Sequence, residues 1–322
     1  MMWGHRKQWQ FLRKSVQLGK TSHAYLFSGK RLLGKKEIAQ EFARLLNCRS
    51  EDFDKKPCRQ CSSCREMEKS CHPDFLLIEN TDKIEETEIN LIRHLGDWLS
   101  LKPGLGKFKV AIIDQFQTFS LAAQSALLKT LEEPRGQTVL ILVSDYPELL
   151  VPTIISRLQE IKFHPLSSQE IINLLLAAGA DESLADRISH LSSGKPLKAR
   201  RLLNPDDLKK EEERIKKFAG MLSQDLVFWF HEIEVLTKES DVLPENLEVW
   251  LDFTRLLFLV KMGIVKKENL NQNQQKLFGK TESIPASKLK SLLFSLDKTN
   301  YLLSRSNVNP RLAIENSILG LF

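Results

Sequence analysis

Residues 29–36 read GKRLLGKK, that is, a glycine, four residues, a second glycine and two lysines. This spacing is typical of a loop whose backbone N–H groups wrap the phosphates of a nucleotide at the start of a helix. An apolar run at 25–27 precedes the loop, and an amphipathic stretch at 35–46 follows it. Because this is the strand, loop and helix order that the motif requires, we expect an α/β domain of the nucleotide-binding type.

Two positions lack the groups that ATP hydrolysis needs. The hydroxyl that follows the loop lysine in an active enzyme, and that ligates Mg²⁺, is replaced by Lys36, whose ammonium group repels a cation. The apolar run at 109–114 ends in Asp114, where such folds hold Mg²⁺ through water, but the next residue is Gln115, whose neutral amide cannot act as a base. The sequence therefore predicts a degenerate nucleotide site that does not hydrolyse ATP. The residues of this site are Gly29, Gly34, Lys35, Lys36 and Asp114.

Two leucines argue for weak or absent nucleotide binding at this site. The loop usually needs small residues close to the phosphates, and Leu32 and Leu33 are expected to crowd it. The sequence leaves open whether nucleotide still binds.

The first half of the chain alternates short apolar runs with amphipathic stretches. The apolar runs lie at 25–27, 75–78, 110–113, 139–143 and 160–163, and the main amphipathic stretches lie at 35–46, 85–99 and 121–131. Alternating strands and helices give right-handed crossovers, so we expect a parallel five-stranded sheet flanked by helices. Residues 164–170 read HPLSSQE and are expected to bound this domain, with Ser167 as the N-cap of the next helix.

The second half of the chain has no strand pattern and is expected to be helical. Residues 171–203 predict two or three short helices with Gly179 and Gly194 as breaks, and the charged run at 205–214 predicts a solvated helix face. Apolar residues then recur at helical spacing, which favours a buried core over a ligand site. These residues are Leu247, Trp250, Leu251, Leu257, Leu312, Ile318 and Leu319.

Four cysteines lie within seventeen positions: Cys48, Cys58, Cys61 and Cys64. Deprotonated sulfurs at C-x2-C spacing suit tetrahedral Zn²⁺, and four protein ligands leave no open position for catalysis, so we expect a structural zinc site. One alternative is a pair of disulfides, which a reducing cytoplasm disfavours. The other is an iron–sulfur cluster, which three close cysteines and a fourth are able to hold.

The fifth cysteine stands outside this set. Cys71, beside His72, is in a position to substitute as a ligand, but we interpret it as a small buried residue. The segment His72-Pro73-Asp74 is expected to turn the chain into the next strand.

An arginine just before the last apolar run is a candidate for phosphate recognition. Arg157 ends the segment TIISR at 153–157, and a guanidinium in a fixed loop stays charged and binds phosphate oxygens in pairs. The spacing alone favours the simpler interpretation, an ordinary surface arginine.

Charge and hydropathy exclude few classes of protein. The formal net charge of +6, from 47 basic and 41 acidic side chains, is a mild bias toward an acidic partner such as nucleic acid. The start of the chain does not read as a signal peptide, and no apolar run has the length of a membrane span, so we expect a cytoplasmic protein.

Several segments together resemble the clamp-loader subunits of bacterial DNA polymerase III, the delta-prime subunits above all. The resemblance is carried by HAYLF at 23–27, the loop at 29–36, the cysteines, His72-Pro73-Asp74, ALLKTLEEP at 126–134 and PTIISR at 152–157. It returns in NVNPRL at 307–312, whereas the stretch from about 205 to 300 is similar only in being helical.

The resemblance implies three domains and a set of partners. The domains are an AAA+ type P-loop domain at 1–165 with a zinc-binding module at about 48–71, a helical lid at 166–205 and a helical collar at 206–322 that holds a ring of subunits together. The implied partners are gamma/tau ATPase subunits and a delta subunit in a hetero-pentameric ring, with the sliding clamp and primed DNA reached through that complex.

The resemblance also implies roles for single residues. In such rings the pair Ser156 and Arg157 lies at a subunit interface, and Arg157 points at ATP bound by the neighbour as an arginine finger in trans. Leu158 replaces the usual cysteine, which leaves that pair intact. Leu197 stands where an active relative places a nucleotide-sensing arginine, and the other sensor falls near Ser144 or Asp145.

The favoured hypothesis is a non-hydrolysing clamp-loader subunit that acts as part of the DNA polymerase III holoenzyme. The alternative is an active, gamma/tau-like ATPase of the same ring, favoured by Lys35 and Asp114 and disfavoured by Lys36, Gln115 and Leu197. A zinc-dependent nucleic-acid-binding module is the third hypothesis, although the basic residues form no obvious stripe.

Overall fold

The computed structural model describes residues 4–79, 85–134, 136–238, 243–267, 270, 272–304 and 308–321. Asn307, the first residue of the 307–312 segment, lies outside this part. The chain forms two compact units. Unit 1 contains Met1–Leu166 and Lys195–Leu197, and unit 2 contains Ser167–Gly194 and Lys198–Phe322.

Unit 1 is built on the predicted parallel sheet. Its strands are β1 (Ala24–Ser28), β2 (Phe75–Glu79), β3 (Lys109–Asp114), β4 (Thr138–Ser144) and β5 (Gln159–Lys162), in the spatial order β2-β3-β4-β1-β5. Every neighbouring pair is parallel. The carboxyl ends of the strands therefore share one edge of the sheet, where the residues that follow each strand are brought together.

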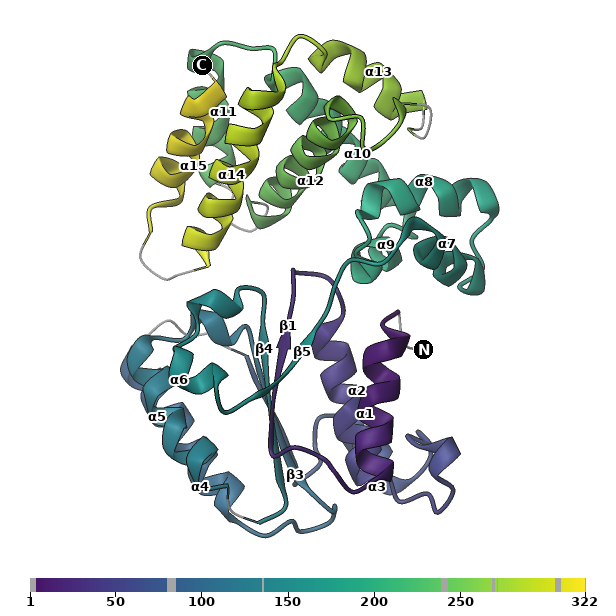
Figure 1. Ribbon diagram of the computed structural model, residues 1–322, viewed down its shortest axis with the longest axis vertical. Helices are drawn as coiled ribbons and strands as arrows, with labels where there is room; N and C mark the ends of the chain where they lie inside the picture. Colours follow the sequence, from purple (N-terminus) through teal and green to yellow (C-terminus); the bar gives the residue numbers. More distant parts are fainter. Residues whose placement is uncertain are drawn as a thin grey trace. The chain divides into compact units, whose positions relative to one another are not determined.

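Helices cover both faces of this sheet (Figure 1). One face carries α1 (Arg6–Gln17), α2 (Lys35–Asn47) and α3 (Ser62–Glu68), and the other carries α4 (Glu85–Ser100), α5 (Leu121–Glu132) and α6 (Pro152–Ile155). Side chains alternate between faces along a strand, so Tyr25 and Phe27 of β1 pack in the first layer, whereas Leu26 packs in the second. The predicted five-stranded α/β fold is confirmed.

Unit 2 is helical among the residues that the structure describes. Its helices are α7 (Ser168–Ala177), α8 (Glu182–Ser192), α9 (Pro196–Arg201, whose first two residues belong to unit 1), α10 (Pro205–Met221), α11 (Leu226–Lys238), α12 (Leu243–Lys261), α13 (Gln272–Thr281), α14 (Ala286–Leu303) and α15 (Pro310–Ile318). Ser167 caps α7 in a capping box with Glu170, as the sequence predicts for its N-terminus. Gly179 and Gly194, predicted as breaks, adopt positive φ angles of 94° and 74° beyond the ends of α7 and α8.

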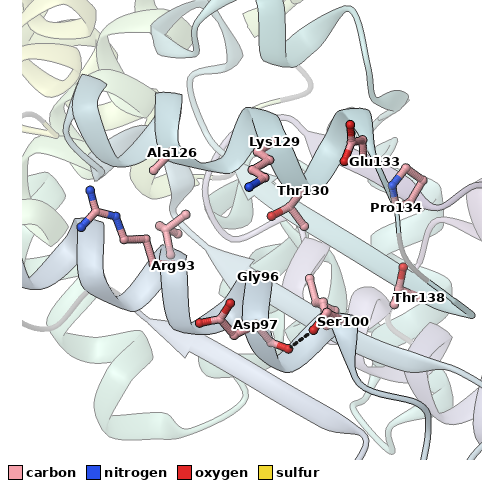
Figure 2. A pocket seen from close by; sticks show the side chains of 12 residues that line it. Arg93, Gly96, Asp97, Ser100, Ala126, Lys129, Thr130, Glu133, Pro134 and Thr138 are labelled. Atoms are coloured by element: carbon pink, nitrogen blue, oxygen red, sulfur yellow. Dashed lines mark hydrogen bonds between the residues drawn. The ribbon is translucent and has the colours of Figure 1, made fainter.

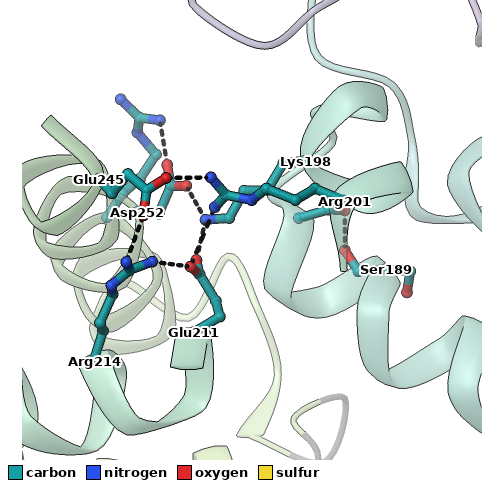
Figure 3. Close-up of polar contacts among 9 residues, drawn as sticks. Ser189, Lys198, Arg201, Glu211, Arg214, Glu245 and Asp252 are labelled. Atoms are coloured by element: carbon teal, nitrogen blue, oxygen red, sulfur yellow. Dashed lines mark hydrogen bonds and ion pairs between the residues drawn. The ribbon is translucent and has the colours of Figure 1, made fainter. Parts of the chain in front are cut away.

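A buried ionic cluster joins three helices of unit 2 (Figure 3). The Nζ atom of Lys198 in α9 lies 2.7 Å from Oε1 of Glu211 in α10 and 3.1 Å from Oδ2 of Asp252 in α12. Arg201 and Arg214 surround these groups and both pair with Glu245. Burial by itself lowers the pKa of Lys198, but Asp252 and Glu211 outweigh this effect and raise that pKa, so the ammonium form is held.

The apolar stripes of unit 2 are only partly buried. Leu247, Trp250, Leu251, Leu257 and Ile318 belong to the core, and Trp250 stacks on Phe218 with ring centroids 5.1 Å apart. Leu312 and Leu319 are 62% and 49% exposed, so the expectation that they are core residues is wrong. Periodicity finds the apolar face of a helix, but it does not show whether the same chain covers that face. The division of the helical part into a lid at 166–205 and a collar at 206–322 stays a prediction.

Candidate functional site

The loop after β1 is shaped by its two glycines. Gly29 has φ 144°, and a Cβ at this position would lie 2.3 Å from the carbonyl oxygen of Phe163. Gly34 has φ 87° and precedes α2. Both positions are therefore restricted to glycine by backbone angle or by space.

The two leucines of the loop do not both crowd a phosphate position. The side chain of Leu33 is fully buried in the layer between the sheet and α2, so for this residue the expected crowding is wrong. Leu32 has φ 62°, and its carbonyl oxygen accepts a hydrogen bond from the backbone N–H of Leu197 at 3.2 Å. Leu197, predicted at a sensor position, thus lies against the loop.

The side chain of Lys35 is satisfied within the chain. Its ammonium group donates to the carbonyl oxygens of Gly29 and Lys30 at 2.7 and 2.8 Å, and to Oδ1 of Asp145 at 2.7 Å. An ammonium has three protons to donate, so these bonds use all of them. A phosphate that approaches Lys35 has to displace these acceptors.

Lys36 occupies the carboxylate end of the site. Its Nζ atom lies 2.7 Å from Oε1 of Glu79 and 3.2 Å from Oδ2 of Asp114, the last residues of β2 and β3. Burial by itself lowers the pKa of Lys36, but the two carboxylates outweigh it and raise that pKa. A fixed ammonium group therefore neutralises Asp114, the residue that the sequence predicts for a Mg²⁺ site.

The residue after Asp114 is Gln115, whose side chain is a neutral amide. Gln115 is exposed and left-handed, with φ 50°, and its backbone N–H donates to Oδ1 of Asp114 at 3.0 Å. Gln117, which sequence reasoning did not single out, accepts the backbone N–H of Asp145 through Oε1. Glu79 was also missed, although its position at the end of an apolar run was a signal that it shares an edge with Asp114.

The four predicted zinc ligands come together. The sulfur atoms of Cys48, Cys58, Cys61 and Cys64 all lie within 4.8 Å of one another. Backbone N–H groups donate to two of these sulfurs, from Cys58 to Cys48 and from Cys61 to Cys58, each at 3.3 Å. Such bonds suit thiolate ligands of a metal.

Hydrogen bonds and burial shift the pKa values of the clustered cysteines in opposite directions. Hydrogen bonds from the backbone N–H groups of Gln60 and Cys61 lower the pKa of Cys58 to about 6. Burial raises the pKa of Cys48 and of Cys64. A soft divalent cation fits this donor set, because its charge compensates the deprotonation of buried thiols. Cys71 is outside the cluster and exposed, so its interpretation as a buried residue is wrong.

Arg157 follows α6 and precedes β5. Its guanidinium group lies 2.8 Å from Oε1 of Glu132, the last residue of α5, and donates to the carbonyl oxygen of Thr153 at 2.8 Å. Ser156 is the C-cap of α6, and its hydroxyl also donates to Thr153.

Arg157 and the phosphate loop lie at opposite ends of the parallel strands. Arg157 lies at the amino end of β5, whereas the loop follows the carboxyl end of the parallel strand β1. The five residues of β1 span roughly 16 Å. The structure therefore does not bring Arg157 to the loop of its own unit.

A separate pocket of about 480 Å³ lies between α4 and α5 (Figure 2). Charged residues of both signs line it, among them Arg93, Asp97, Lys129 and Glu133. None of the predicted site residues lines this pocket.

The sequence profile of the family described as "DNA polymerase III, delta subunit" matches residues 4–167, which are 164 of the 322 residues. The chain belongs to this family. The matched segment contains the whole of the sheet, the phosphate loop, the cysteine cluster and Arg157.

Relatives of this family member include several DNA polymerase III subunits. It is 27% identical to the DNA polymerase III subunit tau of Bacillus subtilis over 96% of its length and 59% of the length of that relative. It is 32% identical to the subunit delta' of Pseudomonas aeruginosa over 56% of either chain. The chain thus spans less than two thirds of the length of these relatives. A gamma subunit-related protein of Thermotoga maritima is similar over 98% of both chains, with 19% identity and a TM-score of 0.43.

Within the described residues of this family member, no helix combines the length and the apolar character that crossing a membrane requires.

Proposed function

We propose that the chain is a delta-prime type subunit of a DNA polymerase III clamp loader and that it does not hydrolyse ATP. It would assemble with gamma/tau ATPase subunits and a delta subunit in a hetero-pentameric ring, which places the sliding clamp on primed DNA. In this proposal the chain contributes structure and one arginine, while its partners turn over ATP.

The position of Lys36 carries the non-hydrolysing part of the proposal. Its ammonium group, paired with Glu79 and Asp114, stands where an active site needs a bound cation. Hydrolysis by a fold of this type depends on Mg²⁺ to neutralise the charge that develops on the phosphates. A lysine ammonium group carries only one positive charge, and it cannot coordinate phosphate oxygens and water as Mg²⁺ does.

Topology supports the action of Arg157 in trans. Arg157 precedes the amino end of β5, whereas the loop of its own unit follows the carboxyl end of β1, and the guanidinium group is partly exposed beside Glu132. An exchange of that surface carboxylate for a phosphate of a neighbouring subunit costs little, because exposed ion pairs are weak. In such a site an arginine finger raises the rate of ATP hydrolysis by a factor of roughly 10³ to 10⁵.

We further propose that the four cysteines bind one structural Zn²⁺. All four positions of a tetrahedron would be filled by protein sulfurs, so the ion would stabilise the module at 48–71 and would have no catalytic position.

The test compares the isolated chain with a reconstituted complex. The isolated chain is expected to show no ATP turnover above buffer, with or without primed DNA. A complex that contains the wild-type chain should show DNA-stimulated turnover and clamp loading, and the Arg157→Ala chain should lower both. ATP turnover by the isolated chain that is lost in Lys35→Ala would contradict the proposal.

One observation favours a second candidate function, an active gamma/tau-like ATPase. The tau subunit of Bacillus subtilis is similar over 96% of this chain, whereas the similarity to the delta' subunit of Pseudomonas aeruginosa covers 56%. Lys35 and Asp114 are also present. The same turnover measurement on the isolated chain distinguishes the two functions.

A further inference from the structure

The segment between the cysteine cluster and β2 contains a buried histidine with a defined tautomer. Nδ1 of His72 accepts the backbone N–H of Asp74 at 3.1 Å, which leaves the ring proton on Nε2. Nε2 then donates to the hydroxyl of Ser63 at 3.0 Å. Ser63 lies in α3 next to Cys64, so the ring connects the helix that carries a cysteine ligand to the start of β2.

Asp74 holds the loop that leads from α4 into β3. Its carboxylate accepts the backbone N–H groups of Gly104, Leu105 and Gly106 at 2.8, 2.7 and 2.7 Å. The side chain is 1% exposed, and Nζ of Lys109 lies 3.6 Å away. Burial by itself raises the pKa of Asp74, but the three N–H groups and Lys109 outweigh it and lower that pKa. The carboxylate form is thus fixed at the centre of the loop.

Two residues that flank Cys48 bind the same loop. The side-chain oxygen of Asn47 accepts the backbone N–H groups of Lys107 and Phe108, each at 2.9 Å. Arg49 donates to the carbonyl oxygen of Leu105 at 3.1 Å. A Cβ at Gly106 would lie 2.6 Å from Asn47, so the loop packs closely on the end of α2.

The result is an irregular loop with an unusual hydrogen-bond pattern. Five successive backbone N–H groups, at residues 104–108, all donate to the side chains of Asp74 and Asn47 rather than to backbone carbonyl oxygens. In the same loop, Leu101 is 60% exposed and Leu105 is 48% exposed. The backbone amides of an irregular, exposed loop exchange rapidly with solvent, and the loop moves freely, unless hydrogen bonds of this kind hold it.

We propose that His72 and Asp74 link the 101–108 loop to the four-cysteine cluster, so that the cluster holds this loop in place. The cysteines position α3 and Ser63, Ser63 positions the ring of His72, and the ring positions the backbone of Asp74 beneath the loop. Residues of this kind act through their neighbours, as supporting residues around a metal site do.

Hydrogen–deuterium exchange of the full chain tests the link, read on peptides that cover 101–108 and, for comparison, β4. Cys61→Ser should speed exchange of the 101–108 amides by about tenfold or more while β4 stays protected. His72→Ala should give a similar increase with the metal content of the wild type, because it removes the link and leaves the cysteines intact. Cys71→Ser, which changes the exposed cysteine outside the cluster, is the matched control and should exchange like the wild type.

Two results would overturn the proposal. The first is wild-type exchange of 101–108 in His72→Ala or Cys61→Ser. The second is equal acceleration in 101–108 and β4, which would mean that the cluster only stabilises unit 1 as a whole. If Cys61→Ser does not fold, addition of a zinc chelator to the folded wild-type chain gives the same comparison without a substitution.

Discussion

The ammonium nitrogen of Lys36 lies 3.2 Å from a carboxylate oxygen of Asp114 and 2.7 Å from one of Glu79. These carboxylates end two adjacent parallel strands, at the edge where nucleotide-binding folds of this kind place their metal. We propose that Lys36 provides, as part of the chain, the positive charge that a bound cation provides in an active enzyme.

Replacement of Lys36 by serine should create a divalent cation site. The substitution removes the internal cation and adds a hydroxyl, which leaves two carboxylate oxygens and one hydroxyl oxygen for a hard metal. Electron paramagnetic resonance with Mn²⁺ should detect binding by Lys36→Ser and none at this site in the wild type. Lys36→Arg keeps the charge and is the control. The interpretation is wrong if Lys36→Ser and Lys36→Arg bind Mn²⁺ equally.

Lys35→Ala should cost stability and leave ATP turnover unchanged at the level of buffer. The substitution leaves the carboxylate of Asp145 and two carbonyl oxygens without their common donor, which costs about 1–3 kcal/mol of unfolding free energy. Urea denaturation measures this loss, and association with partner subunits should persist. A variant as stable as the wild type would show that these contacts contribute nothing to the fold.

Metal analysis should find about one Zn²⁺ per chain, because four thiolates form one closed tetrahedral site. Cys61→Ser should lose this metal, whereas Cys71→Ser should retain it, since Cys71 lies outside the cluster. Stoichiometric iron with a visible chromophore would instead support an iron–sulfur cluster. A folded wild-type chain without any metal would exclude both.

Arg157→Ala should leave the fold and the assembly of the ring intact and strongly lower DNA-stimulated ATP turnover and clamp loading. The isolated chain loses only a surface pair with Glu132, which is worth about 0–1 kcal/mol. Arg157→Lys should restore little activity, because an ammonium keeps the charge but loses the forked geometry. If the alanine variant loads clamps at the wild-type rate, Arg157 is an ordinary surface residue with no role at a neighbour's ATP site.

The loss in total turnover from Arg157→Ala depends on how many ATP sites the ring has. If the arginine completes one site among several, single-site measurements should show a larger effect than the sum over all sites. Glu132→Gln is the matched control, since it breaks the same intramolecular pair and retains the guanidinium group.

Lys198→Met should destabilise unit 2 by about 3 kcal/mol or more, because the carboxylates of Glu211 and Asp252 remain buried without their shared partner. Chemical denaturation followed by tryptophan fluorescence reports this loss, since Trp229 and Trp250 lie in the core of unit 2. Lys238→Met removes a surface lysine paired with Glu234 and should leave the unfolding midpoint near that of the wild type. Equal effects of the two substitutions would contradict the importance of burial.

The sequence by itself determined the five strands of unit 1 and three of its helices, in their order along the chain; it did not predict α1, α3 or α6. Each predicted strand lies within one or two residues of an observed one, because an apolar run between turn residues has few other ways to be buried. The spacing of the cysteines also predicted their cluster, since ligands at C-x2-C spacing are close in sequence and need little help from the rest of the fold.

Only the tertiary structure decided which distant side chains meet. Glu79 and Asp145 come to the two lysines of the phosphate loop because parallel strands end at one edge, and no local pattern names these residues as partners. The same holds for Asp74 and the 101–108 loop, and for Lys198 with Asp252. Local periodicity specifies which face of an element is apolar, whereas the pairing of charges depends on distances between elements that periodicity does not contain. The sequence pattern did not predict the exposure of Leu312 and Cys71 either, because exposure depends on which other elements cover a residue.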